Sequence, residues 1–121
     1  MKIVNPIAIR GEDLASDYLA KKGYKILERN FRKRYGEIDI VALDRNTLVF
    51  IEVKTRSSNQ FGSPLESITP WKLKSVIKTA QYYKLTHKNL PDSLRIDAVS
   101  IKLSQEGSVN ELELVKNISG F

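Results

Sequence analysis

Two apolar, strand-like segments of the chain carry charged residues at positions that a sheet would normally bury. Segment 36–41 contains Asp39, and segment 49–55 contains Glu52 and Lys54. Because side chains two positions apart in a strand point to the same face, Glu52 and Lys54 share one face. Buried charge is tolerated only when it is paired, hydrogen-bonded or bound to a metal. The two carboxylates and the lysine therefore predict a divalent-cation site with an amine beside it.

Such a site suits the hydrolysis of a phosphodiester bond, which needs a positioned water, a Lewis acid and a cation near the developing charge. Asp39 and Glu52 supply hard oxygen ligands of the kind that Mg²⁺ takes, with Mn²⁺ as a substitute. The backbone carbonyl near Val53 would add a further ligand. Lys54 would orient the attacking water or stabilise the transition state. Whether it acts as a base depends on a pKa lowered by burial and by the cation, which the sequence leaves open.

A helix is expected over residues 9–22, ended by Gly23. Its residues Glu12, Ala15 and Leu19 recur at the spacing of one helical stripe, which would face the core. Glu12 has two interpretations. It either faces the site from this stripe, or lies in the first turn and complements the helix dipole.

Three strands are predicted next, over residues 24–31, 37–43 and 47–54. A basic connection (32–36) joins the first two, and a short turn (44–46) joins the second and third. Short connections of this kind indicate an antiparallel meander. The third strand is apolar on both faces up to its glutamate, as a central strand would be.

Residues 57–67 are polar and predict a loop. Thr69 as N-cap and Pro70 at the first helical position then open a second helix. Strands are expected over residues 94–103 and 112–115. The chain thus predicts one α/β domain, residues 1–121, with a mixed sheet flanked by helices.

Three segments carry a resemblance to a known family: Gly-Glu-Asp-Leu-Ala (11–15), Gly-Glu-Ile-Asp-Ile-Val (36–41) and Phe-Ile-Glu-Val-Lys-Thr-Arg (50–56). Here the chain resembles the PD-(D/E)XK nucleases, which include restriction endonucleases and archaeal Holliday junction resolvases. It is more closely similar to the YraN-type family of uncharacterised bacterial proteins, over nearly its whole length.

The resemblance implies a restriction-endonuclease-like fold and assigns roles at the site. Asp39 and Glu52 would bind Mg²⁺, and Lys54 would assist the water. The helix glutamate of the resolvases maps onto Glu12, as a direct or outer metal contact. Two departures stand out: Ile38 replaces the proline common before the aspartate, and Leu85 rather than a tyrosine lies four residues after Gln81.

The net charge of +6 is unevenly distributed, since residues 1–88 hold 17 Lys and Arg against 9 Asp and Glu. A basic body is typical of a surface that attracts polyanions such as nucleic acid, but many basic proteins are merely soluble, and charge alone favours this simpler alternative slightly. The resemblance to nucleases makes DNA the expected partner. The residues expected to contact nucleic acid are Arg32, Lys33, Arg34, Arg56, Lys74, Lys78 and Gln81. A solvated turn is an equal alternative for residues 32–34.

Three further residues have competing interpretations. Glu37 shares the predicted face of Asp39, but a solvent or edge charge is favoured over a second metal ligand. Trp71 is expected to anchor the core rather than to stack on a base. Asp97 is expected to be an ion-pair partner rather than a residue that contacts the site.

The composition excludes several classes. The absence of cysteine rules out disulfides, thiolate metal sites and cysteine nucleophiles. No apolar run approaches 18 residues and the first residues do not form a signal peptide, so a cytoplasmic protein without a membrane span is expected.

The leading hypothesis is a Mg²⁺-dependent endonuclease acting on DNA, including branched DNA. The alternative is a non-catalytic nucleic-acid-binding module on the same fold, and a weaker third option is a subunit whose basic face binds an acidic protein. Paired cuts would need a homodimer, whose interface is not readable from the sequence.

Overall fold

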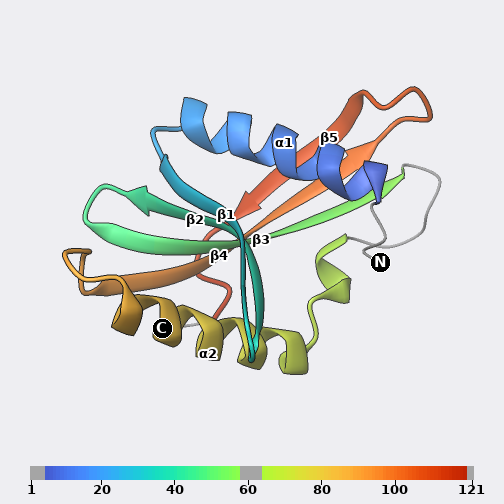
Figure 1. Cartoon of the computed structure of the whole chain (residues 1–121). Helices are drawn as coiled ribbons and strands as arrows, with labels where there is room; N and C mark the ends of the chain where they lie inside the picture. The colour runs from blue at the N-terminus through green and yellow to red at the C-terminus, as the bar shows by residue number, and fades with distance from the viewer. Residues whose placement is uncertain (1–4, 58–63, 120–121) are drawn as a thin grey trace.

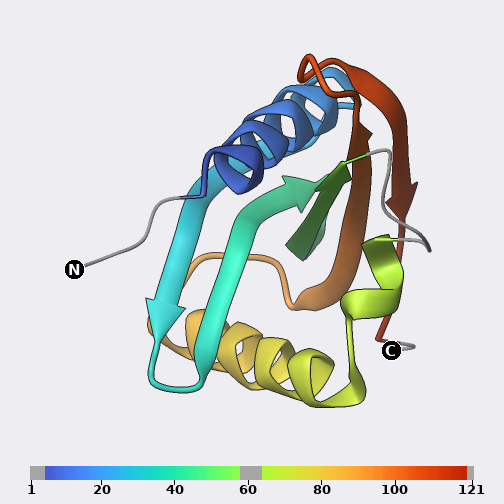
Figure 2. The ribbon, with the colours of Figure 1, turned by 90° about the vertical axis from the view of Figure 1, so that its right-hand side faces the viewer.

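Five strands form one mixed sheet that lies between two helices, α1 on one face and α2 on the other (Figures 1 and 2). The computed structural model describes residues 5–57 and 64–119. The elements in chain order are α1 (Pro6–Lys21), β1 (Lys25–Lys33), β2 (Gly36–Asp44), β3 (Thr47–Ser57), the 3₁₀ turn η1 (Pro64–Ser67), α2 (Pro70–Thr86), β4 (Ser93–Leu103) and β5 (Val109–Val115).

The strand order is β1-β2-β3-β4-β5. The first three strands form the expected antiparallel meander, and β5 is antiparallel to β4. β3 and β4 are parallel, so the chain needs the α2 crossover to join them. The prediction of a restriction-endonuclease-like α/β fold with a mixed sheet flanked by helices is confirmed. Within the described residues, no helix has the length and apolar run needed to cross a membrane.

Helix α1 begins three residues earlier than predicted. The side chain of Asn5 caps it by accepting the N–H groups of Ile7 and Ala8, and Pro6 occupies the first helical position. Glu12 is therefore the seventh residue of the helix, and the first turn contains no acidic residue. The helix-dipole interpretation of Glu12 is wrong.

Strand β1 also extends further than predicted, to Lys33. Arg32 and Lys33 belong to the strand, and only Arg34 and Tyr35 connect it to β2. The expectation that all five residues 32–36 form a connection is therefore wrong. β3 likewise runs to Ser57, so Arg56 lies inside the strand and not after it. Of the predicted loop 57–67, residues 58–63 lie outside the described part of the chain.

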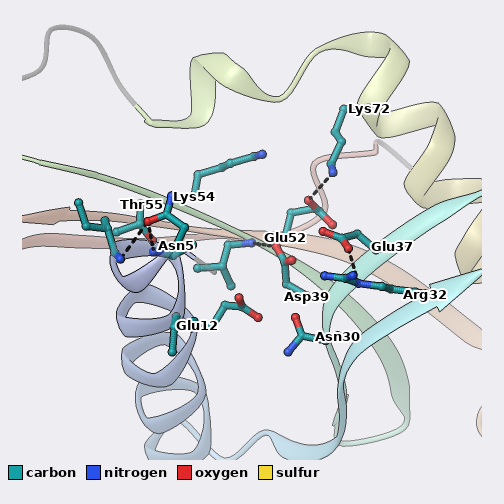
Figure 3. Close-up of a pocket in the computed structure, with 14 residues that line it drawn as sticks. Asn5, Glu12, Asn30, Arg32, Glu37, Asp39, Glu52, Lys54, Thr55 and Lys72 are labelled. Carbon is teal, nitrogen blue, oxygen red and sulfur yellow. Dashed lines mark hydrogen bonds and ion pairs between the residues drawn. The ribbon is translucent and has the colours of Figure 1, made fainter. Parts of the chain in front are cut away.

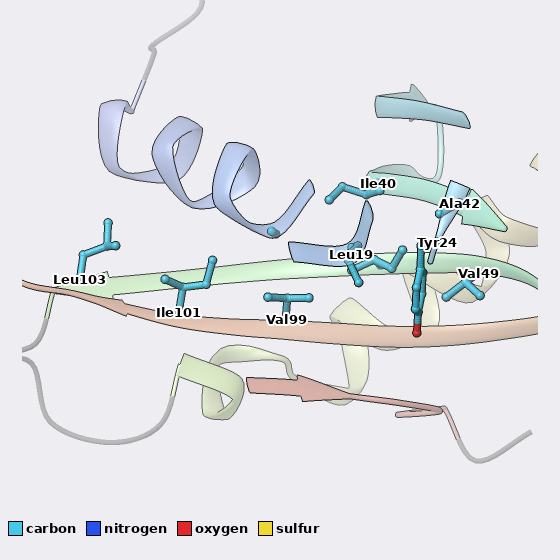
Figure 4. Close-up of a cluster of buried hydrophobic side chains, with 10 residues drawn as sticks. Leu19, Tyr24, Ile40, Ala42, Val49, Val99, Ile101 and Leu103 are labelled. Carbon is cyan, nitrogen blue, oxygen red and sulfur yellow. The ribbon is translucent and has the colours of Figure 1, made fainter. Parts of the chain in front are cut away.

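Two hydrophobic cores lie on opposite faces of the sheet. The α1-side core is shown in Figure 4 and contains Ala15, Leu19, Tyr24, Ile40, Ala42, Val49, Ile51, Val99, Ile101 and Leu103. The α2-side core contains Phe31, Ile38, Val41, Leu48, Phe50, Val76, Ala80, Tyr83 and Ile96. The central strand β3 contributes to both, as its two apolar faces predicted.

Trp71 is not part of either core. Helix α2 starts at the predicted cap, with the Thr69 hydroxyl accepting the Lys72 N–H, and buries a stripe through Val76, Ala80 and Tyr83. Trp71 lies in the first turn, and 78% of its surface is exposed. The prediction of a core anchor is wrong, because this first-turn position lies off the stripe that faces the sheet.

Asp97 is completely buried on β4 and forms the ion pair predicted for it. It accepts hydrogen bonds from the Arg95 guanidinium, the Tyr24 hydroxyl and the Asn117 N–H. Arg95 also pairs with Asp44 at 2.8 Å. This network joins β4, the end of β2 and the segment after β5.

Removing this carboxylate would leave buried donors without an acceptor. We expect Asp97→Ala to lower the free energy of unfolding by about 3–5 kcal/mol. Urea denaturation followed by circular dichroism measures this change. Glu113→Ala, an exposed change on the neighbouring strand β5, should stay within about 0.5 kcal/mol of the wild type. Equal stability of the two variants would contradict the structural role of Asp97.

Candidate active site

β2 and β3 separate at the position of Asp39. Their pairing runs from Asp44 opposite Thr47 to Ile40 opposite Ile51 and then stops. Beyond this point β2 stays paired with β1 while β3 stays paired with β4, and Figure 1 shows the two strands diverging. The backbone therefore opens a fork between two central strands.

Asp39 is held at this fork by the backbone of β3. Its Oδ2 accepts the N–H of Val53 at 2.8 Å, just beyond the last backbone pair of β2 and β3. The alternation of β2 also breaks here, because Ile38 joins the α2-side core while Ile40 joins the α1-side core. The irregular backbone turns the Asp39 carboxylate toward the opening between the strands.

The fork forms one wall of a pocket of about 510 Å³. Figure 3 shows that α1 and the split strands enclose it, while Lys72 reaches it from α2. Its polar lining comprises Asn5, Glu12, Asn30, Arg32, Glu37, Asp39, Glu52, Lys54, Thr55 and Lys72. The four residues predicted to be catalytic, Glu12, Asp39, Glu52 and Lys54, therefore meet in one pocket, together with Val53.

Glu52 is a buried carboxylate with incomplete compensation. Only 1% of its surface is exposed, and its Oε2 lies 3.7 Å from the Lys72 amine. Its Oε1 is buried and has no hydrogen-bond partner among the described residues. Burial, and then the charge of Asp39, raise the pKa of Glu52 to about 8, although Lys72 and Lys54 oppose this. A carboxylate in this state is expected to gain from a bound cation.

Glu12 faces the same pocket from α1. Gly11, one residue before it, is buried against β3, where a Cβ atom would overlap the Thr55 hydroxyl. The glycine therefore lets the helix lie close enough to the strand for Glu12 to reach the pocket. Its Oε1 is buried without a partner among residues 5–57 and 64–119. Burial, followed by the charge of Asp39, raises the pKa of Glu12.

The pKa of Asp39 is raised as well, chiefly by burial, although the Val53 N–H opposes the shift. Within the described ranges, no three Asp, Glu, His or Cys side chains form a complete metal-binding cluster. Mg²⁺ commonly takes one or two carboxylates and fills its remaining positions with water and substrate phosphate. Asp39 and Glu52 fit that partial set of ligands, since the Glu52 Oε1 has no partner among the residues that the structure describes.

Lys54 lies on the same strand face as Glu52, as the two-residue spacing predicted. Figure 3 shows both residues on the side of β3 that faces η1 and α2, whereas Glu12 approaches from α1. Lys72 is therefore a second amine on the side of Lys54. Glu37 also lines the pocket, but its carboxylate pairs with Arg32 at 2.7 Å. The Glu37 side chain is 40% exposed, and its pairing with Arg32 favours the interpretation as a solvent or edge charge over that of a second metal ligand.

The residues predicted to contact nucleic acid are spread over a wider area. Arg32 lines the pocket, while Lys33 and Arg34 are exposed at the tip of the β1–β2 hairpin. Arg56 is half-buried in β3 and does not line the pocket. The three α2 positions are exposed and also lie outside the pocket lining: Lys74, Lys78 and Gln81.

Sequence reasoning missed Lys72 and Asn30. Lys72 precedes the buried Val76 by one helical turn, so it is a charge on the core-facing stripe. A charged residue on a core-facing helical stripe is also the pattern that indicated Glu12. The sequence therefore contained enough information to predict Lys72 as a site residue. Asn30 lines the pocket with a left-handed backbone (φ 56°), which no pattern in the sequence indicated.

Comparison with known proteins places the chain in a family. The model of the uncharacterised protein family UPF0102 matches residues 11–101. A UPF0102 protein of Chlorobium limicola is 53% identical over 92 residues, covering 76% of this chain and 71% of that protein. Another, from Chlorobium phaeobacteroides, is 48% identical over 121 residues, covering 98% and 96%. The chain therefore belongs to the uncharacterised protein family UPF0102, the YraN-type family that its three sequence segments resemble.

Proposed function

We propose that this protein is a Mg²⁺-dependent endonuclease that hydrolyses phosphodiester bonds in DNA. The observation that carries the proposal is the fork between β2 and β3, where Asp39 and the buried Glu52 face one pocket. The Glu52 Oε1 there has no hydrogen-bond partner in the described part of the chain. A purely structural carboxylate at this depth would be expected to have all its hydrogen bonds. A hard divalent cation is the ligand that best completes this site.

Asp39, Glu52 and the backbone at Val53 would hold the cation. A bound Mg²⁺ supplies Lewis acidity toward the phosphate and a water of lowered pKa. The rigidity of the site comes from the protein, because the Val53 N–H fixes Asp39 and packing around the buried strand fixes Glu52. Glu12, from the opposite wall, would orient waters at its Oε1, for which residues 5–57 and 64–119 provide no partner.

The two lysines would act on the substrate. Lys54, on the Glu52 face of the strand, donates hydrogen bonds to the attacking water or to a phosphate oxygen as negative charge develops. Lys72 pairs with the Glu52 Oε2 at 3.7 Å in the present structure. With a cation bound to Glu52, the Lys72 amine would be released to pair with a substrate phosphate.

Cleavage assays test the proposal. The purified protein is incubated with single-stranded, duplex, flap and four-way-junction DNA, with Mg²⁺, Mn²⁺ or EDTA. We expect cleavage with either metal and none with EDTA. We expect Lys54→Ala to lower the single-turnover rate by about 100-fold or more.

Lys102→Ala provides a matched control, since Lys102 is also half-buried in a strand but lies outside the pocket lining. Its rate should equal that of the wild type, and circular dichroism should show that both variants are folded. Binding without cleavage of every substrate with every metal would contradict the nuclease. That result would favour the non-catalytic nucleic-acid-binding module.

A further inference from the structure

Trp71 is a large aromatic side chain exposed beside the pocket. It is the only tryptophan of the chain, and 78% of its surface is exposed. The next residue, Lys72, lines the pocket and pairs with Glu52. Exposed tryptophan contributes little to folding, because the hydrophobic gain requires removal from water. A ligand that covers the indole ring would explain its position.

A second exposed aromatic residue is held close to α2, the helix that carries Trp71. Tyr35, at the tip of the β1–β2 hairpin, is 46% exposed. Its carbonyl accepts a hydrogen bond from the Ser75 hydroxyl, and Figure 1 shows the hairpin tip against α2. Ser75 follows Trp71 by four residues, so both lie on one face of the helix. The hairpin tip is therefore fixed next to the surface that carries Trp71.

Gly36 makes this contact possible. It has a φ of 147°, and a Cβ atom at this position would collide with the Ser75 hydroxyl. The hairpin tip is thus built for close approach to α2. This fixes the backbone of Tyr35 in one place relative to the helix and to the pocket.

The aromatic residues alternate with cations. Arg34 precedes Tyr35 at the hairpin tip, and Lys72 and Lys74 follow Trp71 on the helix. Arg34 and Lys74 are exposed. Basic residues interleaved with exposed aromatic rings are the composition of surfaces that bind single-stranded nucleic acid, in which the rings stack on bases and the cations contact phosphates. The positive charge favours this polyanionic ligand over an apolar protein segment.

We propose that Trp71 stacks on an unpaired DNA base next to the phosphate that occupies the pocket. The protein would then act on single-stranded or locally unpaired DNA in preference to continuous duplex. In a duplex the bases already stack on each other, and a protein ring gains access only after unstacking. The proposal rests on the proposed function for the position of the phosphate, and it adds the class of substrate.

The single tryptophan makes the contact directly measurable. Oligothymidine and a blunt hairpin duplex are each titrated into the protein with EDTA, so that no cleavage occurs. We expect oligothymidine to quench the Trp71 fluorescence and the duplex to have a much smaller effect. Affinities measured by anisotropy of labelled oligothymidine should fall by about 5- to 100-fold in Trp71→Ala, and less in Trp71→Phe.

Leu85→Ala is the matched control, because Leu85 is on the same helix and is also 78% exposed. Its affinity for oligothymidine should be unchanged. Wild-type affinity in Trp71→Ala would overturn the stacking proposal, and metal-dependent cleavage by the same variant would leave the nuclease standing. Lost binding in Trp71→Ala, with no cleavage by the wild type, would keep the stacking contact and remove the nuclease.

Discussion

Replacing Asp39 by asparagine is expected to lower the rate of metal-dependent DNA cleavage by about three orders of magnitude, with the fold retained. The amide oxygen of asparagine still accepts the Val53 N–H, so the hydrogen bond that holds residue 39 against β3 at the fork is kept. The negative charge that would hold the cation is lost. Single-turnover cleavage under saturating Mg²⁺ measures the rate.

Glu37→Gln is the control on the same strand. Glu37 lines the same pocket, but its charge is already paired with Arg32. Its removal should change the cleavage rate by less than about tenfold. Equal rates for Asp39→Asn and the wild type, with both folded, would remove Asp39 from the proposed metal site.

The second prediction concerns the pH dependence of stability without metal. In the folded chain the pKa of Glu52 is raised from 4.5 to about 8, chiefly by burial. Between these values the folded state binds more protons at this residue than the unfolded state does. The contribution of Glu52 to the free energy of unfolding therefore falls as the pH rises through this window.

Glu52→Gln removes this titration. In EDTA, the variant should be more stable than the wild type at the upper end of the window, by about 1–3 kcal/mol. The difference should shrink toward pH 4.5, where the wild-type carboxyl is protonated. Urea denaturation at several pH values measures it. Glu111→Gln, on the exposed β5 surface, should not alter the pH dependence.

Near pH 8, Mn²⁺ should make the wild type more stable than Glu52→Gln, the reverse of the order expected in EDTA. The cation binds the ionised Glu52 of the folded wild type and stabilises it by mass action, whereas the variant gains much less. A wild type and variant with parallel pH dependence in EDTA would contradict the buried, raised-pKa state of Glu52.

The sequence predicted which residues line the candidate site better than it predicted their geometry. Asp39 and Glu52 were identified because charge interrupts two apolar strands, and this signal depends only on residue types. The break in alternation between Ile38 and Ile40 was not predictable, because it follows from where β2 leaves β3. The prediction that Glu37 and Asp39 share one face depends on regular alternation along the strand, and β2 does not keep that alternation between Ile38 and Ile40.

The errors at the helices have identifiable physical causes. Asn5 and Pro6 form a capping signal in the sequence, three residues before the predicted start of α1. Tryptophan is highly buried on average, yet the position of Trp71 in α2 lies off the buried stripe. The spacing between Lys72 and Val76 places Lys72 on the core-facing stripe of α2. Its pairing with Glu52, however, depends on how α2 packs on the sheet.

The most direct test of the account is to locate the metal. Crystals soaked in Mn²⁺ would show its position through anomalous scattering. We predict a peak between the carboxylates of Asp39 and Glu52, with the Lys72 amine moved away from Glu52. A map with no peak at these carboxylates under saturating Mn²⁺, and with Lys72 still paired to Glu52, would contradict the proposed metal site.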